Sequence, residues 1–271
     1  MRRIIGSIIK ANQMFDLIKN KDRIAVAVSG GKDSSLLLWA LTLYAKKLKE
    51  TKNWDVKVYG IHVKVDFYDG YDYQPYLKWI KDMNLDLRII PSNVADILYE
   101  KAKNGKVICS FCSKMKKAIL IREAKKLKCN KVAMGHHIDD AIETLFLNML
   151  YEGRMATFDA KMYLDRTKSR IIRPLILCNE KDLIAVTKKY HIPIMTNMCP
   201  NETTTQRSYL KMFIEKHFYN NKLFPNAYAN FRNALINNQQ ANLWFFKPNK
   251  KSKDLLAVFK RNEATKKEPS K

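Results

Sequence analysis

Short apolar runs alternate with longer stretches of helical periodicity along the first two thirds of the chain. Most of the apolar runs end close to a glycine or a proline, which is typical of buried strands. Five strands are predicted, over residues 24–28, 56–63, 87–90, 131–134 and 170–173. The helices predicted between them cover residues 35–48, 76–83, 112–127 and 139–151. Strands that alternate with helices predict an α/β fold with a mostly parallel sheet and helices on both faces.

Both ends of the chain lack strand patterns. Apolar residues at positions 4, 5, 8, 9, 15 and 18 fit one face of an N-terminal helix. After Pro174 the pattern predicts helices over residues 181–190, 206–218 and 225–238, and beyond residue 247 the chain is rich in lysine, as in a mobile tail. We expect four parts: an N-terminal helix (1–20), an α/β domain (21–176), a helical portion (177–246) and a basic tail (247–271).

The charge balance points to a polyanionic partner. The 271 residues include 50 Lys and Arg against 26 Asp and Glu, a formal charge of +24, while 46% hydrophobic residues remain to form a core. These numbers exclude a disordered basic tail. RNA or DNA is favoured over an anionic membrane surface, because lysine and arginine gain by displacing phosphate counterions. The alternative is a genome whose codon bias favours lysine.

No secretory or membrane segment is evident, since the apolar run at the N-terminus is short and nowhere are there eighteen consecutive apolar residues. The five cysteines form an odd set that does not resemble a disulfide framework. We therefore expect a reducing cytoplasmic compartment. Cys129 and Cys178 adjoin apolar runs and are predicted to be buried as small apolar residues.

The other three cysteines are candidates for chemistry. Cys109 and Cys112 open a predicted helix beside lysines, a setting that lowers the pKa of a thiol, although half a zinc site, a redox pair or chance would give the same spacing. Cys199 lies in a loop between Pro193 and Pro200. Together the three would supply three thiolates, which on an iron–sulfur cluster leaves one iron open.

A glycine loop follows the first strand and opens a helix, where α/β sheets bind ligands. Its residues are Ser29, Gly30, Gly31, Lys32, Asp33 and Ser34. The glycines let backbone N–H groups approach a phosphate, the helix dipole favours anions, and Lys32 adds a cation. The loop matches neither a Walker A motif nor the GxGxxG dinucleotide motif. Asp33 beside a triphosphate makes sense chiefly with a Mg²⁺ between them.

A second polar segment, Gly135 to Asp140, joins the fourth strand to the next helix. Its imidazoles, His136 first, are candidates to contact the α-phosphate, and Asp140 is a candidate Mg²⁺ ligand. The two aspartates at a helix start would also serve as N-terminal caps. Arg173, at the end of the fifth strand, is a candidate phosphate ligand or a surface arginine.

The loop Ser29 to Ser34 resembles the PP-loop of the ATP pyrophosphatases, which grips the pyrophosphate of ATP. With Cys109, Cys112, the segment Gly135 to Asp140 and Cys199, residues 5–240 resemble the tRNA 2-thiocytidine synthetase (TtcA-like) family. The resemblance implies a Rossmann-like, HUP-type five-stranded parallel sheet. Family members often carry a further cysteine where this chain has Thr196, which removes an alternative ligand but leaves the three-thiolate set intact.

The resemblance also implies an activity. ATP with Mg²⁺ would adenylate a base carbonyl, a [4Fe-4S] cluster on Cys109, Cys112 and Cys199 would serve sulfur insertion, and 2-thiocytidine would form at the 5′ edge of the tRNA anticodon loop. The sulfur donor would be a cysteine desulfurase or inorganic sulfide, and a homodimer is compatible. Candidate RNA contacts lie on the helix after the cysteines: Lys114, Lys116, Lys117 and Arg122.

Three other functions stay open from the residues. A 2-thiouridine enzyme would share the cluster, a lysidine-synthetase type of ligase would use ATP without iron, and a non-catalytic RNA-binding protein would hold a structural zinc.

Overall fold

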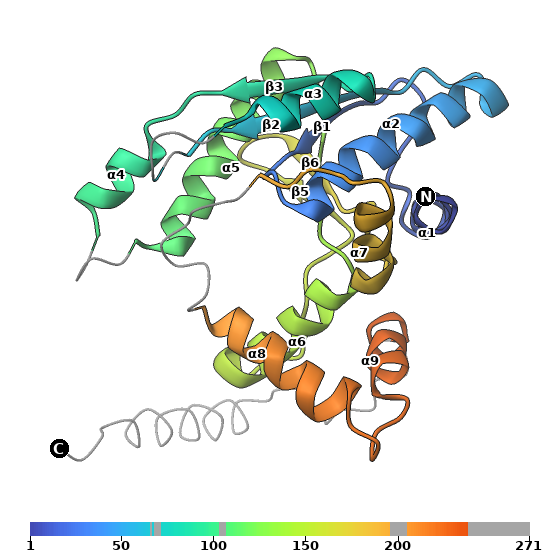
Figure 1. Cartoon of the computed structure of the whole chain (residues 1–271), viewed down its shortest axis with the longest axis vertical. Coiled ribbons are helices and arrows are strands. Elements are labelled where there is room, and N and C mark those ends of the chain that lie inside the picture. Colours follow the sequence, from blue (N-terminus) through green and yellow to red (C-terminus); the bar gives the residue numbers. More distant parts are fainter. Residues whose placement is uncertain (66, 68–71, 103–106, 196–204, 238–271) are drawn as a thin grey trace, which may run out of the picture. The chain divides into compact units, whose positions relative to one another are not determined.

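A six-stranded sheet forms the centre of the computed structural model, which describes residues 1–65, 67, 72–102, 107–195 and 205–237 (Figure 1). The strand order is β3-β2-β1-β4-β6-β5. The strands are β1 (Arg23–Ala27), β2 (Lys57–Val63), β3 (Leu87–Ile90), β4 (Lys131–Ala133), β5 (Lys161–Leu164) and β6 (Ser169–Ile172). The α/β class and the five predicted strands are confirmed.

The sheet contains one strand more than the five predicted, which is β5. β5 pairs antiparallel with β6, while all other neighbours in the sheet are parallel. This edge strand alternates exposed and half-buried residues, so it has no continuous apolar run of the kind that marks the central strands. The turn that joins it to β6 contains Lys168 in a left-handed conformation, with φ at 49°.

Helices cover both faces of the sheet. α2 (Lys32–Lys52) contacts β1 and β2 and also packs against α1 (Arg2–Phe15) and α7 (Glu180–Lys189). α5 (Cys109–Lys126) contacts β1, β2 and β4. A buried cluster unites α5 with the central strands through Ala25, Ile61, Leu120, Ile121, Ala124 and Val132. On the α2 side, Leu36, Leu37 and Leu38 are fully buried. Their burial fixes the first turns of α2, which begins within the glycine loop at Lys32, in the core.

The predicted helices are present, with one addition. The α-helices are α1 (Arg2–Phe15), α2 (Lys32–Lys52), α3 (Gln74–Asp82), α4 (Val94–Glu100), α5 (Cys109–Lys126), α6 (Ile138–Glu152), α7 (Glu180–Lys189), α8 (Gln206–Ile214) and α9 (Ala227–Ile236). The short α4 is not evident from the sequence pattern. α8 continues into a π-helical turn, η1 (Glu215–Tyr219). α8 and η1 together cover the stretch that the sequence predicts as one helix.

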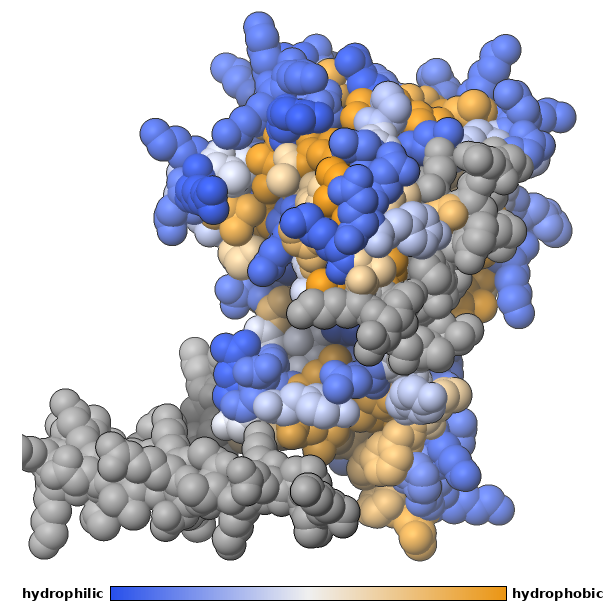
Figure 2. All heavy atoms as spheres, turned by 90° about the vertical axis from the view of Figure 1, so that its left-hand side faces the viewer, coloured by the Kyte–Doolittle hydropathy of each residue, from blue (hydrophilic) through white to orange (hydrophobic). Residues whose placement is uncertain are grey.

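α8 is amphipathic but presents hydrophobic residues on both sides. Leu210 and Ile214 are buried, while Tyr209, Met212 and Phe213 are at least half exposed. In the lower half of Figure 2, at the height of α6 and α8, hydrophobic residues reach the surface. The polar inner side chains of α8 matter for the site described below.

The chain divides into two compact units, Met1–Arg232 and Asn233–Lys271. The four predicted parts stay predictions, and the predicted tail from residue 247 lies outside the described residues. Among the residues that the structure describes, none of the helices combines the length and the hydrophobicity needed to cross a membrane.

Candidate nucleotide and metal site

The glycine loop between β1 and α2 is held closed by its own serines. The backbone N–H of Ser29 donates to the Ser34 hydroxyl at 3.1 Å, and the two hydroxyls lie 3.0 Å apart. Ser34 and Ser35 both donate to the carbonyl oxygen of Gly31 at 3.0 Å. These bonds shape the loop without a ligand, so its backbone is preorganised for an anion at the start of α2.

Two glycines are required by close contacts rather than by flexibility alone. Gly30 has φ at +88°, and a Cβ there would lie 2.6 Å from the Cβ of Met195. A Cβ on Gly135 would lie 3.2 Å from the backbone nitrogen of Ser34. The end of β4 therefore packs directly on the glycine loop. The two polar segments predicted to share a site are brought together.

Lys32 and Asp33 belong to a chain of alternating charges. The Lys32 ammonium lies 3.0 Å from Asp33 Oδ2 and 3.0 Å from Glu180 Oε1, and Lys211 of α8 lies 2.7 Å from the same Glu180 oxygen. Burial alone would raise the pKa of Glu180, but Lys211 and Lys32 lower it to about 2. Burial lowers the pKa of Lys32, and Asp33 with Glu180 reverses this to a net rise. Lys32, Glu180 and Lys211 are thus charged at neutral pH.

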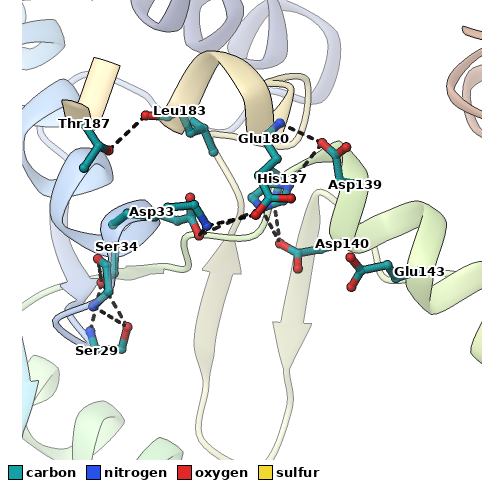
Figure 3. Close-up of polar contacts among 12 residues, drawn as sticks. Ser29, Asp33, Ser34, His137, Asp139, Asp140, Glu143, Glu180, Leu183 and Thr187 are labelled. Carbon is teal, nitrogen blue, oxygen red and sulfur yellow. Dashed lines mark hydrogen bonds and ion pairs between the residues drawn. The ribbon is translucent and has the colours of Figure 1, made fainter. Parts of the chain in front are cut away.

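His137 lies among three carboxylates. Its Nε2 is 3.9 Å from Asp33 Oδ2 and 3.5 Å from Asp140 Oδ2, and its Nδ1 is 3.4 Å from Asp139 Oδ2 (Figure 3). Burial lowers the pKa of His137, but the Asp139 carboxylate beside Nδ1 and the charges of Asp140 and Asp33 raise this pKa overall. His137 therefore links the glycine loop to the start of α6.

Asp140 caps α6, the alternative that the sequence left open. Its Oδ2 accepts the backbone N–H of His137 at 3.0 Å, and its Oδ1 lies 3.5 Å from Arg207 of α8. Arg207 also lies 3.2 Å from Glu143 and donates to the Thr144 hydroxyl at 2.9 Å. Burial, followed by the charge of Asp140, raises the pKa of Glu143 to about 7.

His136 and Arg173 form a second, less charged pair. The Nε of Arg173 donates to His136 Nδ1 at 3.3 Å. Since a guanidinium is always a donor, Nδ1 accepts and the imidazole proton lies on Nε2. Burial lowers the pKa of His136 to about 4, so the ring is neutral. Arg173 is 7% exposed and stacks over the Phe158 ring, so it is not a surface arginine.

The Asp33 carboxylate is suited to bind a metal ion. Its Oδ1 is buried and accepts no hydrogen bond from the described residues, while its Oδ2 lies beside Lys32. A buried carboxylate oxygen without a partner is costly and is satisfied by a cation. Magnesium in ATP sites binds one or two carboxylates together with phosphates. Over the described ranges, His, Cys, Asp and Glu form no cluster of three or more able to hold a metal by themselves.

Cys109 is the first residue of α5, and Cys112 follows it three residues later on the same side of the helix. Cys109 is exposed, and Cys112 is half-buried against the apolar cluster of Val94, Leu98 and Val107. Thiol side chains at this spacing on an accessible helix end suit a soft metal. The third predicted ligand, Cys199, and Thr196 lie outside the described residues.

The two remaining cysteines have a different character. Cys178 is buried, and burial raises its pKa to about 12, which confirms the predicted buried position. Cys129 is half-buried, and burial raises its pKa to about 11. Both are poor thiolates at neutral pH.

The predicted RNA contacts lie along α5. Lys114, Lys117 and Arg122 are exposed, and Lys116 is half-buried. Arg122 pairs with Glu123 at 3.0 Å, so part of its charge is neutralised within the helix. Their role in RNA binding stays a prediction.

Several known proteins are similar to this chain. The PP-loop domain family matches residues 5–218. A tRNA-cytidine(32) 2-sulfurtransferase of Histophilus somni (strain 2336) is 36% identical over 218 residues, which cover 80% of this chain and 67% of the relative. The chain belongs to the tRNA-cytidine(32) 2-sulfurtransferase family. This membership confirms the predicted resemblance.

A second member of the tRNA-cytidine(32) 2-sulfurtransferase family, from Colwellia psychrerythraea (strain 34H), is 34% identical over 217 residues, covering 79% of this chain and 66% of the relative. Among solved structures, the U34-tRNA thiolase NcsA of Methanococcus maripaludis, solved with its [4Fe-4S] cluster, superposes with a TM-score of 0.64. The alignment covers 90% of this chain and 81% of NcsA at 20% identity, so it shows a shared fold.

Three charged residues of this family member were not predicted as site residues: Glu180, Arg207 and Lys211. Glu180 is 148 residues from Lys32, and Arg207 is 67 residues from Asp140. No local spacing reveals such pairs. The signal that the sequence offers is the position of Arg207 and Lys211, which lie on α8, the helix that follows Cys199 in the chain.

Proposed function

We propose that the protein is an ATP-dependent tRNA sulfurtransferase that makes 2-thiocytidine at the 5′ edge of the anticodon loop. The modified base would be cytidine 32, the position that the names of its relatives give. The observation that carries the proposal is the 36% identity to a tRNA-cytidine(32) 2-sulfurtransferase over 80% of the chain. A serine-closed glycine loop packed on Gly135 supports the ATP-dependent half of the reaction.

The reaction has two displacements. The C2 carbonyl oxygen of the base attacks the α-phosphate of ATP and pyrophosphate leaves. Sulfide then attacks C2, and AMP leaves with the former carbonyl oxygen. Such displacements need positioning and charge neutralisation from the protein. The backbone N–H groups from Ser29 to Ser34 and the Lys32 ammonium would hold the pyrophosphate. The neutral His136, with its proton on Nε2, would donate a hydrogen bond to the α-phosphate rather than a charge.

Asp33, through its unpaired Oδ1, would hold Mg²⁺, with Asp140 as a second candidate whose oxygens already contact His137 and Arg207. A bound Mg²⁺ would neutralise charge on the phosphates. Arg173 would fix the tautomer of His136, and its cation beside that ring would assist phosphate binding.

Cys109, Cys112 and Cys199 would hold a [4Fe-4S] cluster. The placement of the first two on one helix end and the cluster in NcsA, which shares the fold, support this ligand set. A cluster with three protein ligands supplies one open iron for sulfur. We also propose a cytoplasmic location, a homodimer, and a cysteine desulfurase or inorganic sulfide as the donor.

The test is reconstitution. Anaerobically purified protein is analysed for bound metal and incubated with tRNA, ATP and sulfide, and nucleosides and AMP are measured by mass spectrometry. We expect 2-thiocytidine and AMP in equal amounts, and neither product with Lys32→Met. AMP without a thionucleoside would favour a ligase, a different thionucleoside would change the base, and zinc without AMP would favour the RNA-binding alternative.

A further inference from the structure

One carboxylate oxygen of Glu180 contacts the ammonium groups of two lysines. Its Oε1 lies 3.0 Å from Lys32 of the glycine loop and 2.7 Å from Lys211 of α8. Lys211 also lies 2.7 Å from Glu180 Oε2. Glu180 is the first residue of α7, and its side chain is 12% exposed, so this carboxylate is fixed while the two lysine stems approach it from different helices. Two like charges are thus gathered at the start of the glycine loop's helix.

Such a pair of ammonium groups repels itself unless an anion lies between them. Glu180 supplies a single negative charge. The pyrophosphate end of ATP, which the proposed function places at the same loop, carries more charge and several oxygens. It therefore competes with Glu180 for Lys32 directly, and Lys211 is within reach because both ammoniums already contact one atom.

Docking of α8 does not require Lys211. Leu210 and Ile214 are buried beneath the helix, and Arg207 contacts Asp140, Glu143 and Thr144. The contacts of Arg207 anchor α8 on α6 one turn before Lys211. The side chain of Lys211 is 38% exposed, which leaves its flexible stem room to change partners.

We propose that Lys211 is a second polyphosphate-binding lysine of the site, stored on Glu180 together with Lys32 until the pyrophosphate end of ATP arrives. The inference rests on the proposed function for the identity of the nucleotide. It adds a cation from α8 to a loop whose own motif contains one lysine. Burial would lower the pKa of Lys211, but Glu180 raises it, so the ammonium is charged when the anion binds.

The test compares ligands with and without a pyrophosphate group. Binding of inorganic pyrophosphate and of AMP is measured by titration calorimetry on the full chain with Mg²⁺. Lys211→Met is expected to weaken pyrophosphate binding about tenfold and to leave AMP binding unchanged, since a charge-assisted contact of this kind is worth roughly that factor. Lys211→Arg should retain most of the affinity.

The matched control is Lys216→Met, which removes an exposed lysine from η1 and should change neither ligand. Glu180→Gln should tighten pyrophosphate binding several-fold, because the competing carboxylate is lost while the side-chain shape is kept. Unchanged pyrophosphate binding in Lys211→Met would overturn the proposal, as would an equal loss for AMP, which would indicate a structural role. Weaker pyrophosphate binding in Glu180→Gln would overturn the storage role.

These measurements use neither tRNA nor sulfur. A protein that binds pyrophosphate through Lys211 but forms no 2-thiocytidine would refute the proposed function and leave this inference standing. If Lys211→Met fails to fold, as judged by circular dichroism, Lys211→Arg and Glu180→Gln still decide the matter.

Discussion

Two regions are stabilised in different ways: the glycine loop, which we call the nucleotide end, and the first turn of α5, which we call the cysteine end. The glycine loop is fixed by hydrogen bonds among Ser29, Ser34 and Gly31 and by the close approach of Gly135. The first turn of α5 is held by apolar packing that reaches Cys112 but leaves Cys109 exposed. The first region is shaped before any ligand binds, whereas the second contributes thiol groups from the first turn of an α-helix. Substitutions should therefore separate ligand binding from stability at the cysteine end only.

The largest expected effect is at Cys109. Cys109→Ala should abolish sulfur transfer and the cluster spectrum, while the free energy of unfolding changes by less than about 0.5 kcal/mol because the side chain is exposed. Iron content and absorption of anaerobically purified protein give the measurement. Cys129→Ala is the control and should keep its iron. Full iron in Cys109→Ala would remove this residue from the ligand set.

At the nucleotide end, Gly30→Ala should cost both binding and stability. The added methyl would lie 2.6 Å from the Met195 Cβ in a backbone with φ at +88°, so the loop must move. We expect ATP to bind about a hundredfold more weakly and the protein to lose about 1–3 kcal/mol. Gly153→Ala is the matched control, because it has φ at +60° but open space around it. Equal ATP affinity in the two variants would contradict a preorganised loop.

The charge cluster at the nucleotide end should be visible in the pH dependence of stability. The pKa of Glu143 is raised to about 7, so the folded protein keeps this proton where the unfolded chain has lost it. Stability from this group is full below the ordinary pKa of glutamate and is lost as the pH rises through 7. Glu143→Gln should therefore be stabilised relative to the parent by about 1–3 kcal/mol more at pH 8 than at pH 5.

Denaturant unfolding at the two pH values measures this difference. Glu152→Gln, an exposed position at the other end of α6, should show no such change. A pH-independent difference for Glu143→Gln would mean that Arg207 keeps the carboxylate ionised.

The sequence predicts those parts of the fold and site that depend on local pattern. Central strands such as β1 are continuous apolar runs and were found, whereas β5, with alternate half-buried residues, was not. The glycine loop and the segment from Gly135 carry their chemistry in adjacent residues, so their meeting at the carboxyl ends of β1 and β4 could be expected from parallel topology.

Long-range charge pairs could not be predicted in this way. The contact of Lys32 with Glu180 and of Arg207 with Asp140 depends on how α7 and α8 pack, which no spacing encodes. The burial of Arg173 was left open for the same reason, because it depends on the Phe158 ring and on the carbonyl of Asp159. Sequence patterns locate motifs, while tertiary packing decides which charges they meet.

The smallest expected effect lies at the cysteine end, on the outer surface of α5. Lys114 and Lys117 are exposed there, and each should release about one counterion on binding tRNA. Single alanine variants should weaken tRNA binding only several-fold and reduce the slope of log Kd against log salt by about 1. Lys52→Ala, an exposed lysine at the end of α2, serves as the control. Unchanged slopes for both α5 variants would move the RNA surface elsewhere, and the cysteine end would then bind sulfur without also guiding the RNA.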